Sequence, residues 1–174
     1  MSSDFRFRPG SGREPPGQKE AAMMLAYRLM RLIEAHSEPL ASGVVEKLES
    51  CEKCKSFGDA ATHELKARVT EIYSHLGEWM LGKKESDIDR RYRAIGRRRA
   101  EQDVPLSQLI WAIALVKENL VEYLQKQTGE LKPFEVLGEL EMMQLLEQFF
   151  DRAVYYAAIG YEEVHQTLPA SAHN

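Results

Sequence analysis

The stretch DAATHELKARVTEIYSHLGEWMLG, residues 59–82, decides the fold class of this chain. Its apolar side chains recur every three or four residues, which is the spacing of one face of an α-helix. They are Ala61, Leu65, Val69, Ile72, Tyr73, Leu76, Trp79 and Met80. Asp59 suits the N-cap position and Gly82 suits a helix end. The stretch therefore predicts one amphipathic helix with a buried face.

Helical periodicity continues on both sides of this stretch. It predicts further helices over about 19–36, 40–51, 86–102, 106–127 and 133–165. Ser86, with Asp89 three residues later, is expected to cap the helix that follows it. Val104-Pro105 separates that helix from the next, because the residue before a proline avoids helical geometry.

The length of 174 residues suffices for one domain with a hydrophobic core. We expect this domain over 18–166, with a flexible tail at 1–17, which holds three prolines and three glycines, and another at 167–174. No strand-like alternation and no glycine-rich phosphate loop is present in the sequence. The sequence therefore predicts an all-α domain of five to six helices.

Composition and charge exclude several classes of protein. The formal net charge of −4 argues against nucleic-acid binding by the whole surface. The longest apolar run, Leu109 to Val116, is far shorter than the roughly twenty residues that a membrane-spanning helix needs. The N-terminus has no apolar stretch typical of a secretory signal, and the chain has only two cysteines. We expect a cytoplasmic protein without a membrane or nucleic-acid partner.

The two cysteines, Cys51 and Cys54, form a CxxC pair. A structural zinc site needs four ligands, and the nearest histidines, His36 and His63, do not stand at a standard spacing from the pair. A thioredoxin-like redox motif needs a βαβ context, which the helical pattern lacks. We interpret the cysteines as ordinary thiols near a helix end and expect no metal.

His63 and His75 are the histidines that a haem could use as an axial ligand. Neither falls on the apolar stripe of residues 59–82, so we expect both to face water and expect no cofactor. No HExxH or serine-nucleophile motif is present. We therefore expect a protein without enzymatic activity.

Six arginines fall within ten residues, in RRYRAIGRRR at 90–99. Arg90, Arg93 and Arg97 share one helical face, because they are three and four residues apart. With Arg98 they form a candidate patch for an anion or an acidic partner protein. The alternative is a solvated helix face whose arginines pair with Glu85, Asp87, Asp89 and Glu101.

The two C-terminal helices carry more apolar surface than one small domain usually covers. A large apolar patch exposed on a soluble protein commonly marks an interface. We therefore expect a homodimer formed through these helices. The candidate interface residues are Leu109, Ile110, Ile113, Val116, Phe150, Val154 and Ile159.

Several segments resemble one known family. They are Gly77-Glu78-Trp79-Met80-Leu81, RYRAIGRRRAEQ at 91–102, Val104-Pro105-Leu106-Ser107, Trp111-Ala112 and YYAAIGYEE at 155–163. These segments resemble the RsbRD-type N-terminal domain. That family supplies sensory domains to bacterial stress-signalling proteins, the RsbT co-antagonists of the stressosome, and to some sensor kinases.

The resemblance implies a non-haem, globin-like helical bundle, usually dimeric, that passes a signal along its last helix to a signalling partner. A phosphorylatable STAS output domain would be expected next, yet the sequence ends at Asn174. We therefore expect a stand-alone sensor module or an output domain supplied by a partner. The alternatives are a carrier or sensor of an apolar small molecule such as a fatty acid, and a haem-binding globin-like sensor.

Overall fold

A computed structural model describes residues 16–128 and 133–167, and all regular structure within them is helical. The elements are α1 (Pro16–Ala35), α2 (Ser37–Ser50), η1 (Glu52–Cys54), α3 (Asp59–Ser74), η2 (Glu78–Gly82), α4 (Glu85–Glu101), α5 (Leu106–Thr128) and α6 (Pro133–Thr167). The predicted all-α class is confirmed. The expected tails at 1–17 and 167–174 fall largely outside the described residues.

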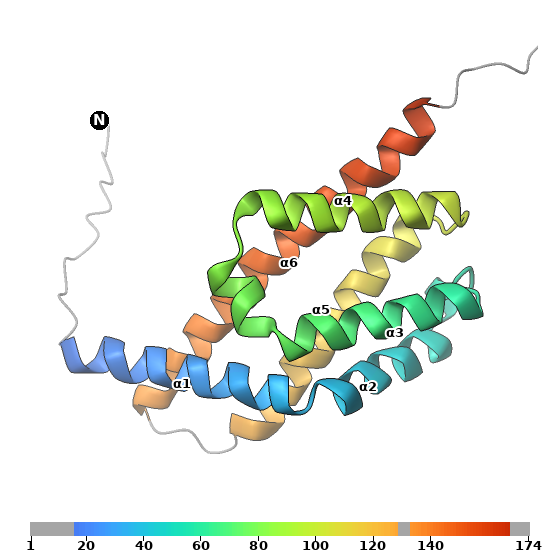
Figure 1. Cartoon of the computed structure of the whole chain (residues 1–174). Helices are drawn as coiled ribbons and strands as arrows, with labels where there is room; N and C mark the ends of the chain where they lie inside the picture. The colour runs from blue at the N-terminus through green and yellow to red at the C-terminus, as the bar shows by residue number, and fades with distance from the viewer. Residues whose placement is uncertain (1–15, 129–132, 168–174) are drawn as a thin grey trace, which may run out of the picture.

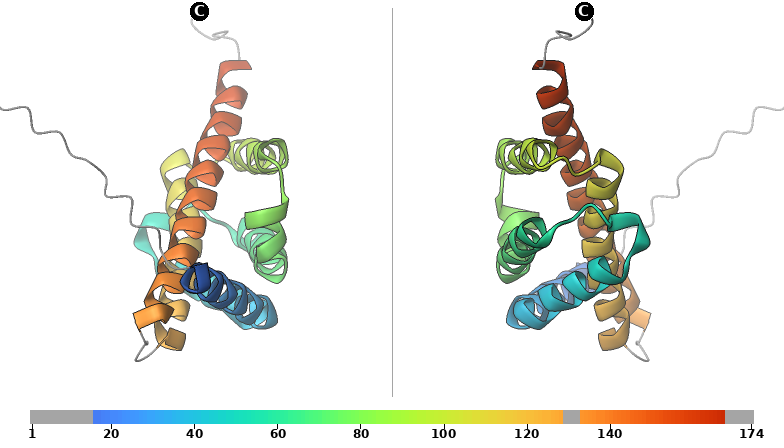
Figure 2. Two further views of the ribbon diagram at one scale, coloured as in Figure 1. Left: turned by 90° about the vertical axis from the view of Figure 1, so that its left-hand side faces the viewer. Right: turned by 90° about the vertical axis from the view of Figure 1, so that its right-hand side faces the viewer.

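The helices form two layers. α5 and α6 lie side by side, and α1 to α4 cross them on one side (Figures 1 and 2). α3 packs along α2, and α4 packs across the second half of α6 (Figure 1). The core lies between the layers, where Ile33, Tyr73, Leu120, Met142 and Phe149 have no solvent exposure.

α6 is the longest helix, and its last turns continue beyond α4 (Figure 1). Apolar residues of its first half pack against α1, and its second half packs against α4. Neither α6 nor any other helix in the described part of the chain is long and apolar enough to cross a membrane.

The prediction of one unbroken helix over 59–82 is wrong. α3 ends at Ser74, and after a short turn the chain forms a π-helix in which the Lys83 N–H donates to the Glu78 carbonyl at 2.9 Å. The Glu34 carboxylate of α1 accepts a hydrogen bond from the Gly77 N–H at 3.1 Å. The break is thus stabilised by a residue far away in sequence, which helical periodicity does not reveal.

Two predicted N-caps are also wrong. α3 begins after Gly58 rather than at a capping Asp59, and α4 begins after Lys84 rather than after Ser86. At the start of α4 the Asp87 carboxylate accepts a hydrogen bond from the Lys84 N–H at 3.1 Å. Acidic side chains are favourable throughout the first helical turn, so their presence does not fix which residue is the cap.

Candidate functional site

α4 and α6 cross with their backbones in direct contact at two glycines. A Cβ atom on Gly96 would lie 1.9 Å from the carbonyl oxygen of Ala157. A Cβ atom on Gly160 would lie 2.0 Å from the carbonyl oxygen of Arg93. Neither distance leaves room for a side chain, so this crossing requires glycine on both helices.

Two arginines of α4 hold the next turn of α6. Arg93 Nη1 donates to Glu163 Oε1, while Arg97 Nε and Nη2 donate to Glu163 Oε2 at 2.8 and 2.6 Å. Arg93 also donates to Asp89 at 2.7 Å, which fixes its guanidinium from the side of α4. We call Gly96, Gly160, Arg93, Arg97 and Glu163 the α4–α6 junction.

A second link joins the start of α4 to α6. Glu85 accepts a hydrogen bond from Arg152 at 2.9 Å and another from the Tyr156 hydroxyl at 2.8 Å. The hydrogen bonds from Arg152 and Tyr156 lower the pKa of the Glu85 carboxyl. α6 is therefore tied to α4 on both sides of the glycine contact.

Three further arginines of α4, at 91, 98 and 99, face α3. Arg91 donates two hydrogen bonds to Glu71, at 2.8 and 2.9 Å, and its guanidinium lies over the Trp79 ring at 4.7 Å. Arg98 donates to Glu64 at 3.0 Å. α4 thus forms ion pairs with both of the helices that flank it.

Arg99 is the most buried charged residue among those described, with 2% of its surface exposed. Its guanidinium donates to Glu64 at 3.1 Å, to the Ala61 carbonyl at 3.2 Å and to the Gln102 side chain, and it faces the Phe57 ring. Burial lowers the pKa of Arg99, yet an arginine stays charged across the accessible pH range. Glu64 is therefore the counter-ion of a buried cation.

The four arginines of the predicted anion patch are not one open surface. Arg93 and Arg97 already share Glu163, and Arg98 turns toward α3. Arg90 is the free member, with 79% of its side chain exposed and a weak 3.7 Å contact to Asp87. Binding of an anion or an acidic partner by these residues stays a prediction.

The alternative of a paired helix face is partly confirmed. Asp87, Asp89 and Glu101 do contact arginines of their own helix. Glu85 instead contacts α6, and the arginines also bind carboxylates of α3 and α6, which are far from them in sequence. One signal for the junction was present in the sequence. Glycine in a helix interior costs about 1 kcal/mol relative to alanine, so glycines at 96 and 160 needed a structural reason.

Four of the candidate interface residues are buried inside the chain, which leaves little of their surface for contact with a second copy. They are Leu109, Ile113, Val116 and Phe150. Apolar side chains of the neighbouring helices cover them, and α4 packs across the second half of α6. Ile110 is 36% exposed, and Val154 and Ile159 are half-buried.

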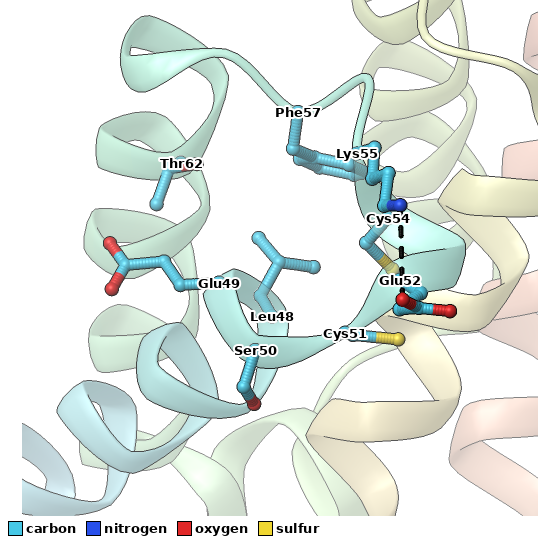
Figure 3. A pocket seen from close by; sticks show the side chains of 9 residues that line it. All are labelled: Leu48, Glu49, Ser50, Cys51, Glu52, Cys54, Lys55, Phe57 and Thr62. Carbon is cyan, nitrogen blue, oxygen red and sulfur yellow. Dashed lines mark ion pairs between the residues drawn. The ribbon is translucent and has the colours of Figure 1, made fainter.

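Cys51 and Cys54 border a surface cleft of about 410 Å³ between the end of α2, η1 and the start of α3 (Figure 3). Both are free thiols. Burial raises the pKa of Cys54 to about 12, and a thiol that ionises so reluctantly is a poor nucleophile and metal ligand. Within residues 16–128 and 133–167 no group of three or more His, Cys, Asp or Glu side chains could hold a metal ion.

The two histidines considered for haem lie on the surface. His63 and His75 are both exposed, on α3 and just after its end, and the His75 Nδ1 lies 3.1 Å from the Glu71 carbonyl. The prediction that both face water is confirmed.

All five residues of the α4–α6 junction lie within sequence segments that resemble a known family. The family model for the RsbT co-antagonist protein rsbRD N-terminal domain matches residues 38–174. The chain belongs to this family. The matched residues of the RsbRD N-terminal domain include the entire α4–α6 junction, whereas α1 precedes them. Membership indicates a signalling or sensor domain of stressosome type.

No curated protein and no solved structure matches the chain, so the globin-like description stays a prediction.

The junction leads to a prediction about the ionisation of Glu163. The hydrogen bonds from Arg97 and Arg93 lower the pKa of its carboxyl below the usual value near 4.5. A lowered pKa in the folded state means that the ion pairs stabilise the fold above the usual pKa and are lost as pH falls through the lowered value. Carboxyl ¹³C NMR should show this low midpoint. Replacing Arg97 with alanine should raise it, whereas Arg90→Ala should leave it unchanged.

Proposed function

We propose that this chain is a non-enzymatic input domain that passes a change in its helical body along α6 to a signalling partner. The observation that supports the proposal most strongly is the α4–α6 junction. At that junction the two backbones are in contact, so α4 cannot shift without moving α6 or breaking the contact. Signal transfer by small shifts between packed helices is a common mechanism in switching proteins.

The partner follows from the family. The family description names a co-antagonist of RsbT, and we propose that this chain helps to control an RsbT-type protein within a stressosome-like assembly. The last turns of α6 project beyond α4, where another domain or protein has access to them (Figure 1).

The relay along α6 has a direct test. Removing both junction arginines, in the double variant Arg93→Ala/Arg97→Ala, should speed amide hydrogen exchange in residues 161–167 by roughly tenfold or more, because the helix end then opens locally. Arg90→Ala is the matched control, since Arg90 contacts only its own helix among the residues described. Equal exchange at 161–167 in wild type and both variants would contradict a relay through the junction.

We further propose a homodimer through the exposed side of α5 and α6. Ile110 of α5 and Val154 and Ile159 of α6 are partly exposed apolar residues, and Tyr155 and Leu140 of α6 are exposed as well. A two-fold axis along this side would bring the same residues of both copies together and set the two α6 ends close to each other.

Charge placed on this surface should dissociate the dimer. We expect Val154→Glu/Ile159→Glu to convert a dimer at tens of micromolar into a monomer, measured by sedimentation velocity, because buried interfacial carboxylates lack partners. Met24→Glu on α1 is the control, since Met24 is exposed on a different helix and should leave the dimer intact. A monomeric wild type, or a charged variant that stays dimeric, would overturn the proposed interface.

A second candidate function is binding of an apolar ligand such as a fatty acid. It is favoured by a surface groove of about 250 Å³ between α1, η2 and α6, lined by Met23, Tyr27, Met30, Leu81 and Leu145 among others. Methionine-rich grooves adapt to apolar ligands. Native mass spectrometry of the purified protein tests this function, because it would detect a ligand that co-purifies.

A further inference from the structure

A small apolar cavity lies between α3, α4, α5 and α6, apart from the α4–α6 junction. Its volume is about 40 Å³, and its wall includes Ile72, Tyr92, Ile95, Ala112 and Phe150. The surface that faces the space is apolar, although the side chains of two arginines border it. Close-packed protein interiors rarely leave such spaces, because atoms that line a void lose their dispersion contacts on one side.

The size and chemistry of the cavity restrict its occupant. A water molecule needs roughly 10–15 Å³ of such space, so the cavity has the size of about three waters. Water is stable in a protein only where it finds two to four polar partners, and this wall offers none. Sites for drug-sized ligands span about 300–1,000 Å³, so larger molecules and a fatty acyl chain are too big.

Phe57 stands between this cavity and the surface. It lines both the apolar cavity and the cleft beside Cys51 and Cys54, where Figure 3 shows it on the connection from η1 to α3. The residue is half-buried, and its ring is contacted from one side by the buried Arg99 guanidinium, whose centre lies 5.6 Å from the ring centroid. Phe57 is therefore the side chain that the cleft and the cavity have in common.

We propose that the cavity is a binding site for an apolar species of one to three heavy atoms, of the size of xenon or dioxygen, which enters past Phe57. Such a molecule restores the missing dispersion contacts without requiring hydrogen bonds. Ile95 of the wall directly precedes Gly96, the residue of α4 that touches α6. The proposed binding site follows from the cavity alone, whereas transmission of the binding event to α6 rests on the proposed function.

Xenon provides the probe. Methyl NMR spectra of the full chain under increasing xenon pressure should show saturable shifts at Ile72, Ile95 and Ile113, which line the cavity, and none at Ile33, which does not. Wild-type spectra in which the cavity methyls shift linearly or not at all would overturn the proposal without any variant being needed.

Three variants test this assignment further. Ala112→Val places extra carbon atoms in the cavity and should abolish the saturable shifts, while Ala41→Val, at an equally buried alanine of α2 that does not line the cavity, should retain them. Phe57→Ala should speed xenon exchange by tenfold or more. Saturable shifts that persist unchanged in Ala112→Val would place the xenon elsewhere and overturn the assignment.

The same experiment separates the binding site from the proposed function. If xenon binding in the cavity changes the position of α6, amide resonances of residues 161–167 should shift together with the cavity methyls. Cavity methyls that saturate while residues 161–167 stay unchanged would support the binding site and contradict the relay.

Discussion

Gly96→Ala should destabilise the protein by about 3 kcal/mol or more, at the upper end of the range for overpacking substitutions. The added methyl group would lie 1.9 Å from the Ala157 carbonyl oxygen and 2.8 Å from the Tyr161 backbone nitrogen. Both obstacles are backbone atoms of a helix that is itself packed in the core, so no side-chain rotation removes the clash. α4 and α6 must move apart, which also lengthens the ion pairs of Arg93 and Arg97 with Glu163.

Denaturant unfolding monitored by circular dichroism measures this effect. Gly160→Ala should cost a similar amount, because its methyl group would meet the Arg93 carbonyl oxygen at 2.0 Å. Gly17→Ala in α1 is the matched control, since no atom lies within 4 Å of the new methyl group and alanine favours helix. A Gly96→Ala variant that unfolds at the wild-type midpoint would show that the two backbones are not in contact.

Glu64→Ala should destabilise the protein by about 3 kcal/mol, the lower end of the range for removing one partner of a buried ion pair. The cause is not the lost attraction alone. Arg99 keeps its charge and remains 2% exposed, so the substitution leaves a buried cation without its counter-ion. Arg98 also loses its bond to Glu64, but it is half-exposed and water can replace the carboxylate.

Removing the cation instead should be milder. Arg99→Met replaces the guanidinium with an apolar side chain, and the remaining Glu64 is partly exposed and still contacts Arg98. We expect a loss of about 1–2 kcal/mol, since the cost of an isolated buried charge is avoided. The double variant Glu64→Ala/Arg99→Met should therefore be more stable than Glu64→Ala. Additive losses in this double-mutant cycle would contradict the assignment of Glu64 as the counter-ion.

Most arginines of the arginine-rich helix α4 are paired with carboxylates of the two helices beside it. α4 is held to α3 by Glu64 and Glu71 and to α6 by Glu163. The side chains of the bonds to α6 are partly exposed, whereas at the two glycines the helix backbones are in contact. Under the proposed function, a shift of α4 relative to α3 would reach the end of α6.

The sequence by itself determined the all-α class and the bounds of most helices, because both depend on local rules. Apolar residues at intervals of three and four define a helical face whatever it packs against. The Val104-Pro105 boundary was predicted for a similar reason, and α4 indeed ends at Glu101, with Asp103 in the left-handed region at φ 56°. The surface positions of His63 and His75 followed from the same periodicity.

Only the tertiary structure decided which of these features act together. Gly77 finds its hydrogen-bond partner Glu34 43 residues earlier in the chain, and Arg93 finds Glu163 70 residues later. The apolar run from Leu109 to Val116 suggested an interface, yet most of it is buried by helices of the same chain. Periodicity shows that a helix has an apolar face or a charged face, but it gives no information about the distance between two helices. That distance is set here by Gly96 and Gly160, because only where side chains are absent can two helix backbones touch.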